Sequence, residues 1–450
     1  MNKDKLIFIE NGDLRKVLLA MGLPMTAGMI VTALYNAADA YFVSGLGNSA
    51  FAAVSIVFPL MQIILGIALT FSNGAASYIA RLLGAGSIPR AQNTAATAVS
   101  FALGSSAAVI AFFLLFLEPV LRFAGASEST LYTAEVYARI IIISGFFTVF
   151  NVTAGGILTA QGKPHKTMLM MSTGAALNII LDPIFIYPLG MGVAGAAYAT
   201  AVSQGLSTLL YTIEINKKDN AVHFSFRYTV CDKEILAQIF KIGFPIFLYQ
   251  FFASAAIGLT NKAAAPYGDE VISAMGIMLR VTAIGLYIVF GFTKGLLPVI
   301  GINYGAGNMQ RVKEAVRITN KWGAVFCTAF ALILIGTYPF IIKLFSHNAS
   351  AFLKDTAAKA LIYNGIVFIF FAYQSVYCAA FSAMGKAKEG GLLNLSRQGL
   401  FFIPLIFILP KLFGLTGLLF VQPAADLCTV LLTKYFLVKN RALFKGTENN

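Results

Sequence analysis

The heptapeptide GAGSIPR (Gly84–Arg90) returns later in the chain as GAGNMQR (Gly305–Arg311), 221 residues further on. The same offset aligns GLP (Gly22–Pro24) with GFP (Gly243–Pro245). After the heptapeptides the register shifts by one or two residues, and AQGKP around Gly162 then matches AMGKA around Gly385. GVAG (Gly192–Gly195) likewise matches GLTG (Gly414–Gly417). The chain is therefore predicted to contain one structural unit twice.

Composition places this duplicated unit in a membrane. Of 450 residues 58% are hydrophobic and only 12% are charged, and the mean hydropathy is +0.78. Because a helix needs roughly 20 apolar residues to cross a bilayer, the long apolar runs predict about twelve spans and an all-α polytopic membrane protein. These spans begin near Leu14, Ala50, Asn93, Thr133, Lys166, Gly192, Ile235, Val271, Val316, Ala357, Gly391 and Gly414.

The repeat divides the predicted spans into two six-helix bundles. Residues 1–213 form an N-lobe, residues 214–234 a cytoplasmic linker, and residues 235–450 a C-lobe. An even number of spans returns the chain to the same face, so the lobes are expected to be parallel, pseudo-symmetric repeats. Transporters built in this way bind their substrate between the repeats, near the middle of the membrane.

Basic residues are unevenly distributed over the loops. The formal net charge is +14, and the excess gathers in alternate loops, which the positive-inside rule assigns to the cytoplasm. We therefore expect a multi-pass protein of the plasma membrane with both termini in the cytoplasm. The charge reports topology, so the expected partner is the lipid bilayer and not a nucleic acid. The residues concerned include Lys163, Lys166, Lys217, Lys218, Arg311, Lys313, Arg317, Lys386 and Lys388.

Asp182 is one of three carboxylates that lie well inside apolar spans, beside Asp39 and Asp426. It follows Asn178 by four residues, so amide and carboxylate share one face of a helix. Thr200 in the next span adds a hydroxyl that can face the same point. Hard oxygen donors suit Na⁺, and two nearby carboxylates also favour binding of a proton. The sequence thus predicts a site for H⁺ or Na⁺.

The repeat provides an internal control for this site. Asp39 aligns with Thr260, and Asp182 aligns with Ile403, Pro404 or Leu405. Because the second bundle lacks both acids, they are not needed to hold such a bundle together. Their confinement to the N-lobe favours a role in ion coupling, with Tyr35, four residues before Asp39, on the same helix face.

Asp426 aligns instead with Gln204, and a polar residue in both copies favours a contact between helices. Arg280 has two open interpretations: it lines or gates a cleft, or it neutralises an acid such as Asp426.

Further polar residues within the spans are candidates for a substrate cleft, although each also fits a contact between helices. We expect a small-molecule substrate, a monomeric protein, no cofactor and no enzymatic activity, since histidines and cysteines do not accompany a plausible nucleophile. The cleft candidates are Asn36, Gln62, Asn151, Gln250, Arg280 and Asn303.

Several of these segments resemble the multidrug and toxic compound extrusion (MATE) exporters, particularly their bacterial multidrug branch. The resemblance rests on ALYNAADAYFVSGLG (Ala33–Gly47), LNIILDPIFI (Leu177–Ile186) and GVAGAAYATAVSQ (Gly192–Gln204), and it extends over nearly the whole chain. It implies a twelve-helix exporter in two lobes. The family's cation site falls here on Asp39, Asn178, Asp182 and Thr200.

The resemblance implies antiport, in which H⁺ or Na⁺ moving inward drives export of an amphipathic, often cationic drug. A lipid-linked oligosaccharide flippase of the same superfamily is an alternative. A membrane-embedded receptor or enzyme is an alternative of another class.

Overall fold

The computed structural model describes residues 3–345 and 350–444, which fold into helices joined by short turns. Asp13 begins the first long helix by accepting a hydrogen bond from the Arg15 backbone amide at 2.9 Å, which satisfies one of the free donors at a helix start. The helices of the N-lobe are α1 (Lys3–Asn11), α2 (Leu14–Ser44), α3 (Asn48–Gly84), α4 (Ile88–Leu115), α5 (Leu117–Phe123), α6 (Glu128–Ala160), α7 (Pro164–Ile186) and α8 (Gly192–Ile215).

The C-lobe follows the linker, which contains the short 3₁₀ helix η1 (Phe226–Tyr228). Asp232 caps the first helix of the C-lobe by accepting a hydrogen bond from the Glu234 backbone amide at 2.7 Å. The elements of the C-lobe are α9 (Lys233–Ala264), η2 (Ala265–Tyr267), α10 (Asp269–Gly305), α11 (Met309–Phe345), α12 (Ala351–Phe368), α13 (Phe371–Ala383), α14 (Ala387–Leu395), the π-helical turn η3 (Ser396–Leu400), α15 (Phe402–Lys439) and α16 (Arg441–Phe444).

Nine helical stretches of the described residues are long and apolar enough to cross a membrane, and the bent pair α12 and α13 makes a tenth. One of the nine, Ala387–Lys439, breaks at Gly414, whose φ of 57° suits glycine. The chain turns back there, because Arg397 before the break contacts Asp426 after it. With this division and the 24-residue helix α8, the fold agrees with the prediction of twelve spans.

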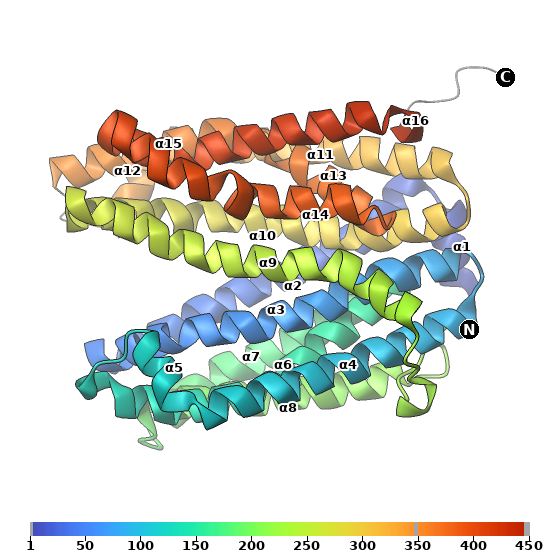
Figure 1. Cartoon of the computed structure of the whole chain (residues 1–450), viewed down its shortest axis with the longest axis horizontal. Helices are drawn as coiled ribbons and strands as arrows, with labels where there is room; N and C mark the ends of the chain where they lie inside the picture. Colours follow the sequence, from blue (N-terminus) through green and yellow to red (C-terminus); the bar gives the residue numbers. More distant parts are fainter. Residues whose placement is uncertain (1–2, 346–349, 445–450) are drawn as a thin grey trace.

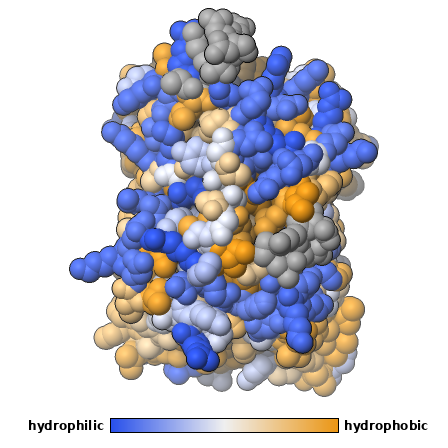
Figure 2. All heavy atoms as spheres, turned by 90° about the vertical axis from the view of Figure 1, so that its right-hand side faces the viewer, coloured by the Kyte–Doolittle hydropathy of each residue, from blue (hydrophilic) through white to orange (hydrophobic). Residues whose placement is uncertain are grey.

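The helices form two groups, and α2, α3, α9 and α10 make most of the contact between them. Figure 1 shows α9–α15, coloured yellow-green to red, beside the blue and green helices of the N-lobe. Across the boundary, α2 packs against α10, and α3 packs against both α9 and α10. The helices α1 and α16 lie at the same end of the molecule, as an even number of spans requires (Figure 1). Figure 2 views this end and shows many hydrophilic side chains on it.

The two lobes are in close contact near the α1 end. A Cβ atom added to Gly295 of α10 would lie 2.6 Å from the Gly22 Cα of α2, and one added to Gly74 of α3 would lie 2.9 Å from the Ile239 carbonyl carbon of α9. Arg81 of α3 also donates to the Gln238 side chain of α9 at 3.2 Å. Such backbone approach requires small residues, so the lobes close against each other at this end.

Helix α1 lies across this closed end and contacts both lobes. Its Ile9 side chain is buried, and a Cβ on Gly162 of the N-lobe would meet Ile9 Cδ1 at 2.7 Å. The Ile9 carbonyl accepts hydrogen bonds from Asn303 of α10 at 3.4 Å and from Arg311 of α11 at 3.1 Å. The α1 backbone is therefore bonded to the C-lobe while its side chains pack on the N-lobe.

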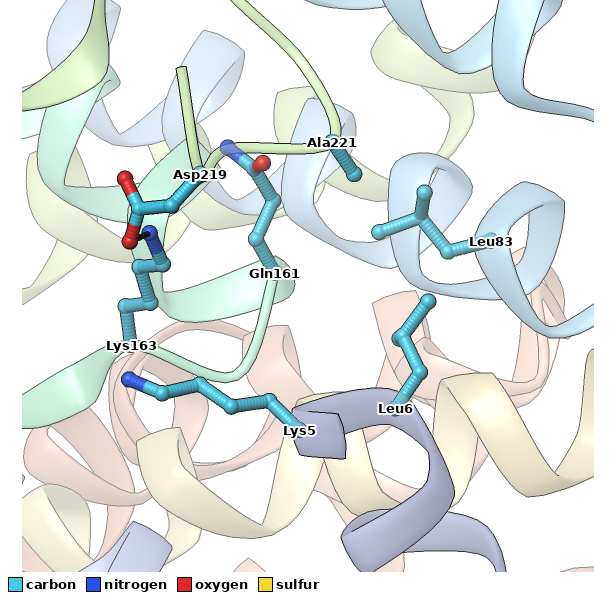
Figure 3. Close-up of a pocket in the computed structure, with 7 residues that line it drawn as sticks. All are labelled: Lys5, Leu6, Leu83, Gln161, Lys163, Asp219 and Ala221. Atoms are coloured by element: carbon cyan, nitrogen blue, oxygen red, sulfur yellow. Dashed lines mark hydrogen bonds and ion pairs between the residues drawn. The ribbon is translucent and has the colours of Figure 1, made fainter. Parts of the chain in front are cut away.

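Figure 3 shows the N-lobe side of this contact, where Lys5 of α1 points toward Lys163 and Leu6 points toward Leu83 of α3. The buried Lys163 Nζ lies 2.6 Å from the Asp219 carboxylate. This hydrogen bond holds the pKa of the Asp219 carboxyl below its ordinary value. The ion pair fixes the linker to the turn between α6 and α7.

Candidate functional site

The pair of helices α7 and α8 brings Asn178, Asp182 and Thr200 together. Asn178 and Asp182 lie one turn apart on α7, and the Asn178 amide donates to Asp182 Oδ1 at 3.3 Å. The same amide donates to Thr200 Oγ1 on α8 at 3.3 Å. All three residues are buried, and Asp182 has no solvent exposure. The i, i+4 spacing read in the sequence thus produces a shared face that points at the neighbouring helix.

Two residues of α2 approach this group. Asp39 lies within electrostatic range of Asp182, and Tyr35 lies within range of both carboxylates and of the Thr200 hydroxyl. The structure therefore brings together all five residues of the predicted cation site, which come from α2, α7 and α8.

Unused oxygen atoms remain at this site. Asp182 Oδ2 and Asn178 Oδ1 are buried and have no hydrogen-bond partner among the described residues. Leaving such acceptors without a partner costs about 1–3 kcal/mol each, and more for a charged group. A proton on the carboxylate or a Na⁺ ion between the oxygens would remove this cost, so the donor set fits either ion.

A cavity of about 190 Å³ lies between the lobes, where α3 faces α9. Gln62 and Pro59 line it from α3, and Phe247, Phe251 and Ser254 line it from α9. The wall is apolar and aromatic with two polar side chains, a combination typical of pockets for small organic molecules. Gln62 is the member of the predicted cleft set that this cavity includes.

The remaining cleft candidates lie in different surroundings. Asn36 and Arg280 are exposed, and Gln250 is partly exposed. Asn151 donates to the Gln204 side chain at 2.8 Å and accepts from Thr208 at 2.9 Å, which joins α6 to α8. Asn303 is buried at the α1 end, where it donates to the Val299 and Ile9 carbonyls.

Asp426 has a different partner from the one considered in the sequence. Arg397 Nε lies 2.7 Å from Asp426 Oδ1, and both side chains are buried. The interpretation that Arg280 neutralises Asp426 is therefore wrong. Arg280 is exposed on α10, whereas the reversal at Gly414 places η3 directly against the second part of α15.

Sequence reasoning missed two residues of these buried groups. Tyr137 of α6 is buried within electrostatic range of Asp39, Tyr35 and Asp182, but nothing in its local sequence separates it from the other tyrosines. Arg397 stands in NLSRQG, a polar stretch close to a turn. Its burial depends on the reversal of the chain at Gly414, which the local sequence does not show.

Comparison with known proteins identifies the family of this chain. The MatE family model matches residues 24–184 and 245–408, one segment in each lobe. The chain is 28% identical to the multidrug export protein MepA of Staphylococcus haemolyticus, with 98% of this chain and 97% of the relative covered. It is 29% identical to MepA of Staphylococcus aureus, with 96% and 95% covered.

Solved structures give the same result for the fold. A structure described as the outward-facing conformation of a multidrug resistance MATE family transporter matches with a TM-score of 0.91 at 28% identity, and 98% of this chain and 99% of that chain are covered. A MOP superfamily transporter from Pyrococcus furiosus, described as having a binding pocket of reverse polarity, matches with the same score, identity and coverage. The chain belongs to the MatE family of multidrug export transporters, membrane proteins that cross the bilayer many times.

Proposed function

We propose that this protein is a secondary active exporter of amphipathic, often cationic organic compounds, driven by inward movement of H⁺ or Na⁺. The observation that carries the proposal is the buried group of Asp182, Asn178 and Thr200 beside Asp39. Its carboxylate and amide each keep an oxygen free of hydrogen-bond partners among the described residues. The exporter acts as a monomer in the plasma membrane, needs no cofactor and is not an enzyme.

The distribution of charge supports an orientation in which the α1 end faces the cytoplasm. Lys163, Lys217 and Arg311 lie in the turns or helix starts at this end, and hydrophilic side chains cover much of it (Figure 2). Basic loops stay on the cytoplasmic side. The contact between the lobes at this end, together with the similarity to an outward-facing transporter, supports a state closed toward the cytoplasm.

The cavity between α3 and α9 supports the substrate class. Phe247 and Phe251 offer aromatic faces for planar apolar groups, and rings of this kind also attract organic cations. Gln62 and Ser254 supply hydrogen-bonding groups at the same wall. The substrate enters from the cytoplasmic side when the lobes separate there, and it leaves from the cavity after they close.

Coupling requires that the ion and the substrate prefer different states of the protein. Asp39 connects the two events, because it lies on α2, which packs against α10 of the other lobe. Binding of H⁺ or Na⁺ reduces the repulsion between Asp39 and Asp182 and allows α2 to shift against α7, on which it packs. This movement changes the interface between the lobes and releases the substrate.

Ethidium accumulation in cells without their own exporters tests the transport activity. Expression of the protein should lower the dye content of energised cells, and collapse of the ion gradients should abolish the difference. Unchanged dye levels and unchanged drug resistance in cells that contain the protein in their membrane would contradict the proposal.

A further inference from the structure

The C-lobe contains a helix pair that corresponds to α7 and α8 of the N-lobe. Its first member is α14, η3 and the beginning of α15, and its second is α15 after Gly414. Asp426 follows Gly414 by twelve residues, as Gln204 follows Gly192. On the same count Gln422 takes the place of Thr200. A carboxylate therefore lies in the second lobe one helical turn from the counterpart of a predicted ion ligand.

The Asp426 carboxylate forms an ion pair with Arg397, a residue of the same lobe. Arg397 donates to Asp426 Oδ1 at 2.7 Å, and the Gln422 amide donates to the same oxygen at 3.1 Å. The Arg397 guanidinium lies 4.9 Å from the centre of the Phe371 ring, and it also interacts with Tyr249. The Arg397 and Asp426 side chains are 9% and 13% exposed, so the positive charge is enclosed by the second lobe.

In the N-lobe, the residues that correspond to Gln374 and Asp426 are hydrogen-bonded to each other. Asn151 stands eleven residues before Gly162, and Gln374 stands eleven before Gly385. In the N-lobe Asn151 bonds the Gln204 side chain. In the C-lobe Gln374 is 4% exposed, and neither of its amide atoms has a partner in the part of the chain that the structure describes. Asp426 faces the guanidinium instead.

The backbone around Arg397 differs from the backbone at the corresponding position of the N-lobe. Counted from the same two glycines, Arg397 takes the place of Gly174. A Cβ on Gly174 would collide with the Ser207 hydroxyl of α8 and would lie 3.5 Å from the Ser203 carbonyl oxygen, so α8 packs closely on Gly174 and leaves no space for a larger side chain. The C-lobe instead has the π-helical turn η3, with Arg397 inside it. Turns of this kind are rare and concentrate at functional sites.

We propose that Arg397 is a tethered cation that occupies, in the C-lobe, a carboxylate site that otherwise binds a free hard cation, Na⁺ or H⁺. A buried carboxylate requires a compensating charge. A free ion can leave when the lobes rearrange, whereas a guanidinium on the same chain cannot. Without the arginine charge, Asp426 and Gln422, which are hydrogen-bonded to each other, offer oxygen ligands of the type found in the N-lobe, and Gln374 stands at the position that corresponds to Asn151. This inference concerns the second lobe and holds whether or not the N-lobe site drives transport.

Binding of ²²Na⁺ to the purified full-length protein in lipid nanodiscs tests the proposal. Arg397→Gln should bind one more Na⁺ per chain than the unchanged protein. Arg397→Gln/Asp426→Asn should return to the unchanged number, because the carboxylate is gone. Arg397→Lys, which keeps a tethered charge, should gain no ion. Equal binding by Arg397→Gln and the unchanged protein, without a new proton on Asp426, would overturn the proposal, as would an extra ion in the double variant.

Two further measurements distinguish H⁺ from Na⁺ and test the proposal even if Arg397→Gln folds poorly. If the new ligand is a proton, Arg397→Gln gains the infrared C=O band of a protonated carboxyl, and the double variant lacks it. Thermal unfolding in NaCl and in choline chloride shows whether Na⁺ stabilises Arg397→Gln, as binding to the folded state requires. Recovery of folded Arg397→Gln in NaCl alone supports the proposal, and failure to recover it in either salt contradicts it.

Discussion

Asp182 in the N-lobe and Asp426 in the C-lobe are both buried carboxylates on corresponding helix pairs, but their partners differ in charge. Asp182 has the neutral amide of Asn178 beside it, together with a second acid on α2. Asp426 has the guanidinium of Arg397 at 2.7 Å. The fold therefore tolerates a carboxylate in either lobe, and we propose that only the N-lobe carboxylate exchanges its compensating cation.

The largest effect is expected from removal of the N-lobe acids. Asp39→Asn and Asp182→Asn should each reduce gradient-driven export to the level of vesicles without the protein, because a neutral amide does not take up H⁺ and binds Na⁺ weakly. Dye transport into everted membrane vesicles measures this loss. Asp355→Asn, which neutralises an exposed acid of the C-lobe, is the matched control and should transport normally. Full transport by both N-lobe variants would remove the proposed site.

Loss of one partner of the C-lobe ion pair should mainly affect stability. Asp426→Asn leaves the buried Arg397 charge without its carboxylate, which costs about 3–5 kcal/mol. Arg397→Gln/Asp426→Asn leaves no charge and should recover most of that loss. Thermal unfolding in detergent compares the two, and Asp355→Asn, which breaks an exposed pair with Lys359, should change stability by less than about 1 kcal/mol. Equal stability of the single and double variants would show that the pair is not enclosed as described.

A smaller effect is expected at the edge of the N-lobe site. Thr200→Ala removes the hydroxyl that accepts from Asn178 at 3.3 Å. Loss of about 1 kcal/mol of hydrogen bonding corresponds to an affinity for the coupling ion roughly five- to tenfold weaker. The ion concentration that gives half-maximal transport measures the change. Thr200→Ser keeps the hydroxyl and should resemble the unchanged protein; equal impairment by Ser and Ala would exclude a role for the oxygen.

The last comparison concerns stability alone and separates the two equivalent amides, Asn151 and Gln374. Asn151→Leu breaks bonds to Gln204 and Thr208 and should cost about 1 kcal/mol of stability per bond. Gln374→Leu removes buried amide atoms that lack partners, and it should leave stability unchanged or raise it slightly. Thermal unfolding of both variants provides the comparison. A larger loss from Gln374→Leu would mean that its amide already has a ligand.

Much of the fold follows from the sequence because hydrocarbon leaves few alternatives. Long apolar runs must become helices, and the repeated GAG turns locate their ends. The N-lobe site was predictable for a similar reason, since four-residue spacing puts Asn178 and Asp182 on one face of α7 and the next helix is adjacent.

The C-lobe pair was not predictable in the same way. Arg397 stands close to a turn in the sequence, where a charged residue normally faces water. Its burial depends on η3 and on the reversal at Gly414, which set the register between two parts of one long apolar segment. Periodicity does not report that register, and Arg280 therefore looked equally suitable as the partner of Asp426. Tyr137 reaches the N-lobe site through the packing of α6, which no local pattern shows.

Transport by purified protein in liposomes, under separately imposed proton and sodium gradients, tests most directly whether coupling is confined to the N-lobe. Asp182→Asn and Arg397→Gln/Asp426→Asn are compared with the unchanged protein at equal amounts of folded protein. The account predicts that the C-lobe double variant transports under the same gradient as the unchanged protein, while Asp182→Asn transports under neither. Gradient-driven transport by Asp182→Asn, together with its loss in the double variant, would contradict it.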